Sequence, residues 1–283
     1  MSAVLRAPGL PRRVLLPLAE LIAAARLAGD VPLPLRLDAA PAQLDERLGG
    51  AAAYDDVRRA VTRADDEGPA GLAALGLLDD GRLDSEAAMA LRVLAGGALL
   101  IQLDLSAVRR GGVVPLRSWF AAGHGVVAQL STSGGRDYEL AWFAPADWVS
   151  QFVRAACLPG VATGESVVPA SVSLPSELLV AGCAAVREGR TDVLASLAAD
   201  HGTAGVAEAL TALETTCRGR LRVLMRRRDV DQKPAITTWL LLDDGWRELR
   251  PGPGATAQLR RRAPRDLALW LAPSVALAAG VAR

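Results

Sequence analysis

The chain has 283 residues, of which 51% are hydrophobic but only 4% aromatic, so a sizeable core must be built mainly of Leu, Val and Ala. Its 32 basic and 31 acidic residues leave a formal net charge of +1, which gives no general reason to expect a nucleic-acid or anionic-lipid partner. The length fits one large domain or two small ones, and three widely spaced cysteines without a CxxC pair favour neither a disulfide framework nor a zinc site.

The N-terminal part of the chain predicts helices separated by short connectors. Residues 14–28 form an apolar run interrupted by Glu20 and Arg26, which favours an amphipathic helix over a signal peptide. The further elements expected before the first sheet are an edge strand or extended connector over residues 31–37, short helices over 41–66, and a short helix over 72–78. Asp84 or Ser85 then provides an N-cap for a helix running to about Leu94.

The stretch from about Ala98 to Leu158 predicts an antiparallel sheet followed by a helix. It holds four short apolar segments separated by turn residues, and within them apolar residues such as Ile101 and Leu103 alternate with polar ones. Because the turns are too short for parallel crossovers, the strands should form a meander. The helix should begin at Pro145, where proline gives up no N–H that the helix needs.

The second half begins with an expected linker and continues with helices. Residues 158–172 are rich in Pro, Gly, Thr and Ser, and three helices should follow, beginning at Pro175, Thr191 and Thr203. All three cysteines fall in segments predicted to be helical, and we interpret them as small buried hydrophobes in a reducing cytosol. They are Cys157, Cys183 and Cys217.

From Arg218 to the end of the chain, the order of elements seen after Ala98 returns about 120 residues later. The matching positions are Trp119 with Trp239, Gly125 with Gly245, and Ala144-Pro145-Ala146-Asp147 with Ala263-Pro264-Arg265-Asp266. Self-similarity at a nearly fixed offset is a signal of the whole fold. It predicts an α+β protein, a quasi-two-fold repeat of an antiparallel β-meander with flanking helical bundles. Its halves are residues 1–160 and 161–283, which we expect to share one central sheet.

Residues suited to catalysis or metal binding are few. We interpret His124, which lies between two glycines, as a turn residue, and His201 as a helix-end residue that can interact with the last carbonyls. No serine forms a GxSxG elbow, and Gly252-Pro253-Gly254 is not a phosphate loop because no GK[ST] follows. The pairs Asp79-Asp80 and Asp243-Asp244 are typical of turns. We therefore expect no catalytic residues, no cofactor and no metal, with an enzyme whose site is unrecognised as an alternative.

Arginine supplies nearly all the positive charge, since Lys233 is the only lysine. The runs Arg226-Arg227-Arg228 and Arg260-Arg261-Arg262 keep an Arg-rich nucleic-acid or anion-binding module open as a further alternative. No known nucleic-acid module or set of stacking aromatics accompanies them, so we predict no nucleic-acid partner. The apolar run at residues 267–282 is shorter than the ~20 residues that a bilayer core requires and contains Pro273, so we predict no membrane span.

Several segments together resemble one protein family. They are Leu75 to Asp84 (LGLLDDGRLD) with the helix after it and the strand from Leu99, then Val172-Ser173-Leu174-Pro175, and the closing pattern Trp239 to Gly245 (WLLLDDG). In order and spacing the sequence is similar to the ESX secretion-associated EspG family of actinobacteria over nearly the whole chain. The resemblance implies a quasi-two-fold α+β repeat, with a central antiparallel sheet and two flanking helical bundles.

The resemblance also implies a function. The best-known members of the family are not enzymes; they are cytosolic chaperones that bind PE–PPE substrate pairs and keep them soluble for type VII secretion. They hold the helical tip of the PPE partner with a loop between early sheet strands and with the C-terminal helical bundle. In this sequence the loop is residues 107–112, so the candidate protein-binding residues are Arg109, Arg110, Gly111 and Gly112. Helices between Pro175 and Thr216 should supply the other side. The implied role is a cytosolic, non-enzymatic chaperone or adaptor of a PE/PPE-like helical client.

Overall fold

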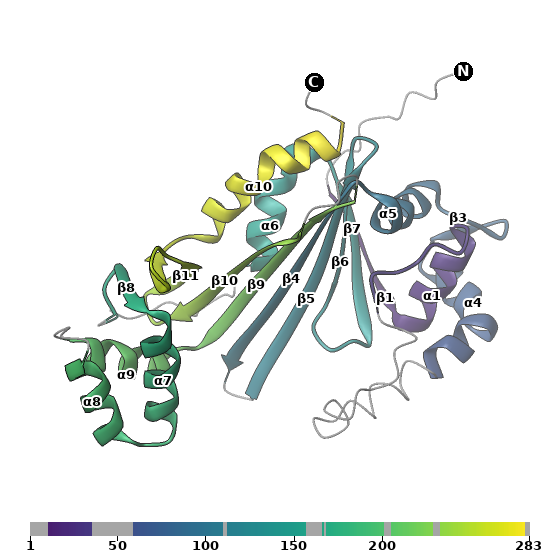
Figure 1. Cartoon of the computed structure of the whole chain (residues 1–283). Coiled ribbons are helices and arrows are strands. Elements are labelled where there is room, and N and C mark those ends of the chain that lie inside the picture. Colours follow the sequence, from purple (N-terminus) through teal and green to yellow (C-terminus); the bar gives the residue numbers. More distant parts are fainter. Residues whose placement is uncertain are drawn as a thin grey trace.

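The fold is α+β and is organised around one large antiparallel sheet (Figure 1). The structure, a computed structural model, describes residues 11–35, 59–109, 112–156, 166, 168–200, 205–228 and 233–280. Ten strands lie in the order β1-β7-β6-β5-β4-β9-β10-β11-β12-β8, and a separate small hairpin pairs β2 (Leu78–Asp79) with β3 (Arg82–Leu83). The predicted α+β fold class with a large antiparallel sheet is confirmed.

The strands of the first half are β1 (Arg12–Pro17), β4 (Leu99–Arg109), β5 (Gly112–Gly123), β6 (Val126–Thr132) and β7 (Asp137–Phe143). Those of the second half are β8 (Ser171–Pro175), β9 (Gly219–Arg227), β10 (Ala235–Leu242), β11 (Gly245–Pro251) and β12 (Thr256–Arg261). The helices are α1 (Leu18–Leu27), α4 (Gly68–Ala74), α5 (Ser85–Gly96), the 3-10 helix η1 (Pro145–Asp147), α6 (Trp148–Ala156), α7 (Ser176–Arg187), α8 (Thr191–Asp200), α9 (Val206–Thr216) and α10 (Pro264–Ala278).

The two faces of the sheet carry different helices, because alternate residues of each strand point to opposite sides. On one face, buried residues such as Leu103, Phe120 and Val223 pack with α6 and α10. We call the opposite side the bundle face. There, α1 and α5 cover strands of the first half, α4 packs against α1, and α7 with α9 cover β8 and β10–β12. The predicted alternation of Ile101 and Leu103 with polar neighbours is confirmed.

Three sequence-based boundaries are wrong, and tertiary pairing explains each. Residues 12–17 form the edge strand β1 against β7, so the predicted helix over 14–28 starts only at Leu18. The helix expected over 72–78 is α4, which ends at Ala74 because Leu78 pairs with Leu83 in a hairpin. The expected linker ends earlier, since Ser171–Pro175 pairs with β12, and Pro175 is the N-cap of α7 rather than its first residue.

Other predictions are confirmed within the described residues. Residues 31–35 form no strand, which agrees with the connector alternative, and residues 59–66 are helical. Asp84 caps α5, its side chain accepting a hydrogen bond from the Ala87 N–H at 2.9 Å. The second and third predicted helices of the C-terminal half correspond to α8 and α9.

The strand order is the same in both halves, and the halves meet where β4 pairs with β9, with Leu103 opposite Val223. In each half a four-stranded meander is completed by an earlier strand, since β1 pairs with β7 and β8 pairs with β12. A helix follows each of these edge strands directly, at Leu18 and at Ser176. The superposition of the two halves stays a prediction that this shared order supports.

Two of the three residue matches expected from the sequence, those of Trp119 and Gly125, are wrong by one position, whereas Ala144 and Ala263 are both N-cap residues of the helix that follows the meander. Trp119 lies on the bundle face and Trp239 on the α6/α10 face, so the two cannot be equivalent; Phe120 shares its face with Trp239. Likewise Gly125 is the second residue of a two-residue turn, whereas Gly245 is the first residue of β11. Both turns hold two residues, since Gly123 pairs with Val126 as Leu242 pairs with Gly245, so these positions are offset by 119 residues (242 − 123) and not 120.

Candidate protein-binding surface

The predicted binding loop lies at the end of the hairpin formed by β4 and β5. Arg109 is the last residue of β4, and its Cα partner across the hairpin is Gly112, whose φ of +121° is a conformation that glycine adopts readily. Arg110 and Gly111 lie outside the described residues. The pairing of β4 with β9 ends at Ala107, so the hairpin continues beyond its neighbour on that side.

Three valines give this end of the hairpin an apolar surface. Val108 and Val113 are 54% and 66% exposed and lie directly opposite each other on the bundle face. Val114, 42% exposed, lies on the other face. β-branched residues suit strands, but an exposed cross-strand pair of them gains little from the protein's own core. The pair therefore offers apolar area to another molecule.

The helices predicted to form the second side lie close to this hairpin. The N–H of Val108 donates a 2.7 Å hydrogen bond to the carbonyl of Arg218, in the connection from α9 to β9. Within the bundle α7 and α9 approach closely at Gly182, where an added Cβ would lie 2.5 Å from the Leu210 side chain. On the surface of α7, Val180 is 69% exposed. The hairpin end and the α7–α9 bundle thus both present apolar side chains to solvent.

The two arginine runs do not form continuous patches, because neighbouring strand residues point to opposite faces. Arg228 donates to the carbonyls of Leu94, at 3.3 Å, and Ala95 at the end of α5, and its burial, with nearby Arg226, lowers its pKa. Arg261 donates to the backbone carbonyl of Asp244 at 2.9 Å, and Arg262 pairs with Glu248 at 3.5 Å. These arginines serve contacts within the fold.

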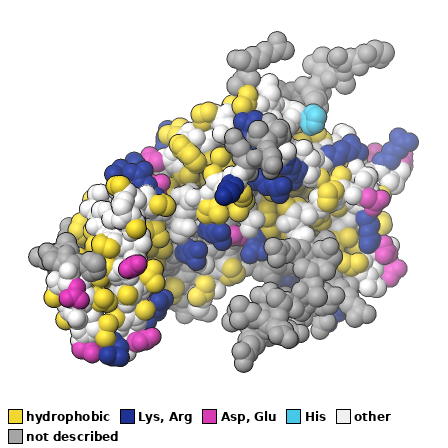
Figure 2. Space-filling model, in the orientation of Figure 1, with side chains coloured by type: hydrophobic (Ala, Val, Ile, Leu, Met, Phe, Trp, Pro, Cys, Tyr) yellow, Lys and Arg dark blue, Asp and Glu magenta, His cyan; other side chains and the backbone are white. Residues whose placement is uncertain are grey.

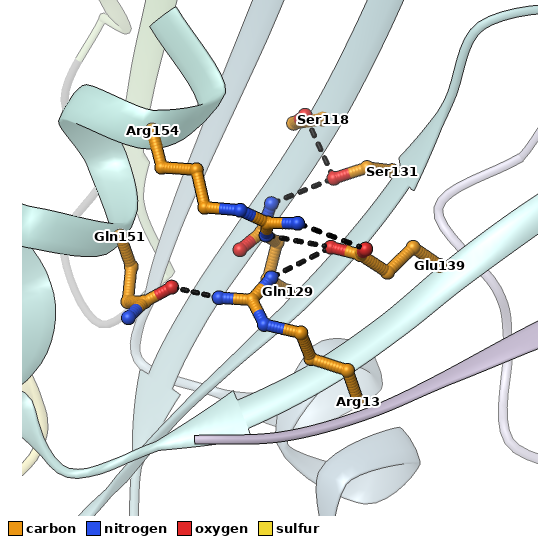
Figure 3. A network of polar contacts seen from close by, with 7 residues as sticks. All are labelled: Arg13, Ser118, Gln129, Ser131, Glu139, Gln151 and Arg154. Carbon is orange, nitrogen blue, oxygen red and sulfur yellow. Dashed lines mark hydrogen bonds and ion pairs between the residues drawn. The ribbon is translucent and has the colours of Figure 1, made fainter. Parts of the chain in front are cut away.

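A polar network that the sequence analysis missed lies between α6 and the first half of the sheet (Figure 3). The carboxylate of Glu139 on β7 pairs with Arg13 of β1 at 2.7 Å and with Arg154 of α6 at 3.1 Å. Arg13 also donates to the side-chain carbonyl of Gln151 on α6. Both arginines point toward the same carboxylate, so the network ties the helix to the edge of the sheet.

Deeper in the same network, three buried polar side chains contact one another (Figure 3). The hydroxyls of Ser118 and Ser131 lie 2.8 Å apart, and the Gln129 amide donates to Ser131 at 2.7 Å. A serine becomes a nucleophile when a base lies within reach of its hydroxyl, and the hydrogen-bond partners here are an amide and a second hydroxyl. The arrangement is that of a structural tie. Period-two spacing of polar residues in β5 and β6 was the signal available in the sequence.

A second missed feature is a buried ion pair in the C-terminal half. The Arg247 side chain is 1% exposed and donates to the Asp244 carboxylate at 2.8 Å and to the Val168 carbonyl at 3.2 Å. Its Nε and Nη1 have no hydrogen-bond partner among the described residues. The turn role predicted for the Asp243-Asp244 pair is confirmed, since these residues connect β10 to β11, but Asp244 is also the counter-ion of a core arginine.

The histidine and cysteine predictions have mixed outcomes. His124 is an exposed turn residue with φ +53°, as predicted, whereas His201 and Cys157 lie outside the described residues. Cys183 lies in α7, where burial above all raises the pKa of its thiol to about 11. Cys217 is not helical; it is the extended C-cap residue of α9, and burial raises its pKa as well. A high thiol pKa leaves little reactive thiolate at neutral pH.

The described residues hold neither a cluster suited to a metal ion nor a helix suited to a bilayer. No group of three or more His, Cys, Asp or Glu side chains there is arranged to hold a metal ion. In the same part of the chain, no helix combines the length and the apolar character that crossing a bilayer demands.

Comparison with known proteins identifies the fold. No protein-family model and no curated protein matches the sequence. The structure is similar to that of EspG5, the type VII secretion system chaperone of Mycobacterium tuberculosis, solved in complex with the PE25–PPE41 dimer. The match has a TM-score of 0.63 at 14% sequence identity and covers 93% of this chain and 95% of the EspG5 chain. The chain therefore has an EspG-like fold, as the sequence resemblance implied.

Proposed function

We propose that this protein is a cytosolic, non-enzymatic chaperone or adaptor of the EspG type, which binds a PE/PPE-like helical protein for type VII secretion. The observation that carries the proposal is the exposed valine pair, Val108 and Val113, on the hairpin that the family resemblance assigns to client binding. A chaperone must cover apolar surface on its client, and apolar residues held rigidly on a sheet do so at low entropic cost.

In this proposal the client lies against two surfaces. Arg109, Arg110, Gly111 and Gly112 form the loop that approaches the tip of the client, since glycine permits close backbone contact and arginine is common at interface hot spots. The α7–α9 bundle, from Ser176 to Thr216, forms the second side. Residues 1–160 and 161–283 act as one unit, and no cofactor or metal takes part.

The proposal is tested by affinity capture from a lysate of the native host, followed by mass spectrometry and size-exclusion chromatography of the complex with the captured client. The test variant is Val108→Ser with Val113→Ser. The matched control, Leu269→Ser with Leu277→Ser, removes two comparably exposed apolar side chains from α10. We expect a PE/PPE-like helical protein to bind the wild type and the control, and to bind the hairpin variant more weakly by about 1–3 kcal/mol.

The loop arginines provide an independent check of the same proposal. Arg109→Glu with Arg110→Glu should weaken binding of the verified client by on the order of 1–3 kcal/mol while the thermal midpoint stays nearly unchanged. Unchanged affinity in both the valine and the arginine variants would exclude the hairpin and leave the helical bundle as the sole contact. Capture of no helical secretion substrate at all would contradict the function itself.

A further inference from the structure

A row of arginines lies along β9 on the bundle face. Arg220, Arg222 and Arg226 all point to that side, because Leu221 and Val223 between them are buried on the opposite face. All three are exposed, and residues two apart on a strand lie about 7 Å from each other. Figure 2 shows Lys and Arg side chains gathered in the middle of the view, between the two helical lobes.

The row lies on the central strand pair rather than beneath either bundle. On the first-half side, α5 contacts β5 and β6; on the other side, α7 contacts β8 and β12. Across the strands, Arg222 is opposite Asp104 on β4 and Thr238 on β10, and Arg220 is opposite Ser106. The row therefore forms part of the floor between the two bundles.

The three guanidinium groups have no ion-pair or hydrogen-bond partner in the described part of the chain. Asp104, the residue directly across from Arg222 on β4, is already paired with Arg117 at 2.7 Å and accepts a hydrogen bond from Gln102 at 2.8 Å. Many arginines elsewhere on the surface do have carboxylate partners, for example at Glu139, Asp192 and Glu214. Three like charges kept in line without counter-ions favour an acidic ligand, since an opposite charge removes their mutual repulsion.

The surroundings of the row favour an acidic polypeptide over a nucleic acid. Exposed apolar residues flank the row on the same face: Val108 and Val113 at the hairpin end, and Ile236 beside Leu224. A charged phosphodiester backbone would gain no favourable contact with these side chains. Trp119, the indole on the strand beside this floor, is 5% exposed and has the Arg117 guanidinium 5.8 Å from its ring centroid. It presents no free face on which a base could stack.

We propose that the β9 row binds the carboxylates of an acidic, amphipathic segment of the protein client, whose apolar side chains contact Val108, Val113 and Ile236. This inference rests on the proposed chaperone function and specifies the chemistry of the client. Arg220 and Arg222 form charge-assisted hydrogen bonds with Asp or Glu residues of the segment, which fix its position between the bundles. Arg226 extends the row toward the far end of β9.

The test uses defined peptides and therefore does not require an identified client. The probe is a fluorescein-labelled amphipathic helical peptide with Glu on one face and Leu on the other, compared with the same peptide carrying Gln in place of every Glu. Binding to the full-length protein is measured by fluorescence anisotropy at two salt concentrations. The test variant is Arg220→Glu with Arg222→Glu, and the control is Arg82→Glu with Arg265→Glu, two exposed arginines elsewhere with the same change in charge.

We expect the wild type to bind the Glu peptide more tightly than the Gln peptide, with a difference that shrinks at higher salt. The row variant should lose affinity for the Glu peptide on the order of tenfold and little for the Gln peptide, while the control binds as the wild type does. If circular dichroism shows that the row variant is unfolded, Arg220→Gln with Arg222→Gln replaces it.

Three results would overturn the inference. The first is equal affinity for the two peptides, or no binding of the Glu peptide. The second is an equal loss in the control variant, which would indicate a general charge effect. The third is tighter binding of oligothymidylate than of the Glu peptide, lost in the row variant, which would make the row a nucleic-acid surface. A client that needs the valine pair but is unaffected by the row variant would leave the proposed function intact and exclude the row.

Discussion

At the scale of single residues, the fold depends on a few charged side chains that are shielded from solvent and stabilised by an oppositely charged partner. Arg247 is the clearest case, because its charge is buried in the core and Asp244 is its only carboxylate partner among the described residues. Removing one member of a buried pair leaves the other charge uncompensated, which costs more than the pair itself contributes. The turn between β10 and β11 is therefore under electrostatic as well as conformational constraint.

Asp244→Asn should lower the free energy of unfolding by about 3–5 kcal/mol, because it leaves the Arg247 guanidinium buried without a counter-ion. Chemical denaturation measures the change. The control is the adjacent Asp243→Asn, whose partner Arg218 has a side chain that is 55% exposed, so that the loss should stay below about 1 kcal/mol. Equal losses of unfolding free energy in the two variants would show that Asp244 stabilises the protein through the turn conformation and not through the buried charge of Arg247.

Glu86 predicts a pH dependence of stability. Its hydrogen bonds from Arg12, the larger cause, and from the Trp142 indole lower its pKa from the usual 4.5. A lowered carboxyl pKa in the folded state gives stability that is present above the unfolded value and is lost as pH falls through the folded value. Glu86→Gln should thus be less stable than wild type at pH 7, by no more than about 1 kcal/mol because the pair is exposed. This difference in stability should become smaller below pH 4.5.

Thermal unfolding of both proteins between pH 3 and 7 tests this expectation. Arg12→Gln, which removes the same interaction from the other side, should show the same narrowing. A difference in stability between variant and wild type that does not change with pH would show that the Glu86 substitution acts through packing.

At the scale of elements, α6 and α10 join the halves over one face of the sheet. The Trp148 indole at the start of α6 donates a 2.9 Å hydrogen bond to the Ala268 carbonyl in α10 and meets Phe120 edge-on, with ring centroids 5.2 Å apart. Phe152, one turn later, is fully buried against both rings. In a core with so few aromatics, this cluster contributes a large share of the apolar area that α6 buries.

Phe152→Ala should therefore destabilise the protein by about 3–5 kcal/mol, since it opens a cavity among rigid rings that cannot close it. Arg154→Ala on the same helix is the control and should cost less than about 1 kcal/mol, because the Arg154 side chain that pairs with Glu139 is 54% exposed. Chemical denaturation of both variants measures these two losses of unfolding free energy. Comparable losses would mean that α6 is held by its polar contacts and not by the aromatic cluster.

At the scale of the whole molecule, the two halves share a sheet and a core. The β4–β9 pairing joins them along nine residue pairs from Leu99 to Ala107, and the cluster beneath α6 and α10 draws residues from both halves. A half expressed alone would expose a long central strand as an edge, and such edges pair with other chains.

Fragments 1–160 and 161–283 should accordingly form aggregates or dimers when produced separately, whereas the full chain should unfold in a single transition. Size-exclusion chromatography and calorimetry test both statements. A monomeric half that unfolds cooperatively would show that the halves are independent domains. Co-expression of the fragments should restore the soluble, cooperative species, because the β4–β9 edge regains its partner.

Local patterns in the sequence were sufficient for much of this fold. Period-two alternation identified the strands of both meanders, and short turns such as Gly123-His124-Gly125 required them to be antiparallel. Proline with a carboxylate two residues later marked the start of α10, and Asp84 marked the start of α5. These signals are reliable because they depend on backbone sterics and on nearby hydrogen bonds.

The tertiary structure alone decided what depends on distant partners. Val14, Leu15 and Leu16 continue the apolar run of α1 in the sequence, but they belong to a strand because β7 offers them hydrogen-bond partners. Trp119 and Trp239 look equivalent in sequence but face opposite sides, since the position that corresponds to Trp239 is Phe120 and a one-residue shift along a strand reverses a side chain's face. The arginine row on β9 is not a run of consecutive charges, because other residues of the strand separate its members. Residues that share a sheet face are separated in the sequence, and only the sheet's register brings them together.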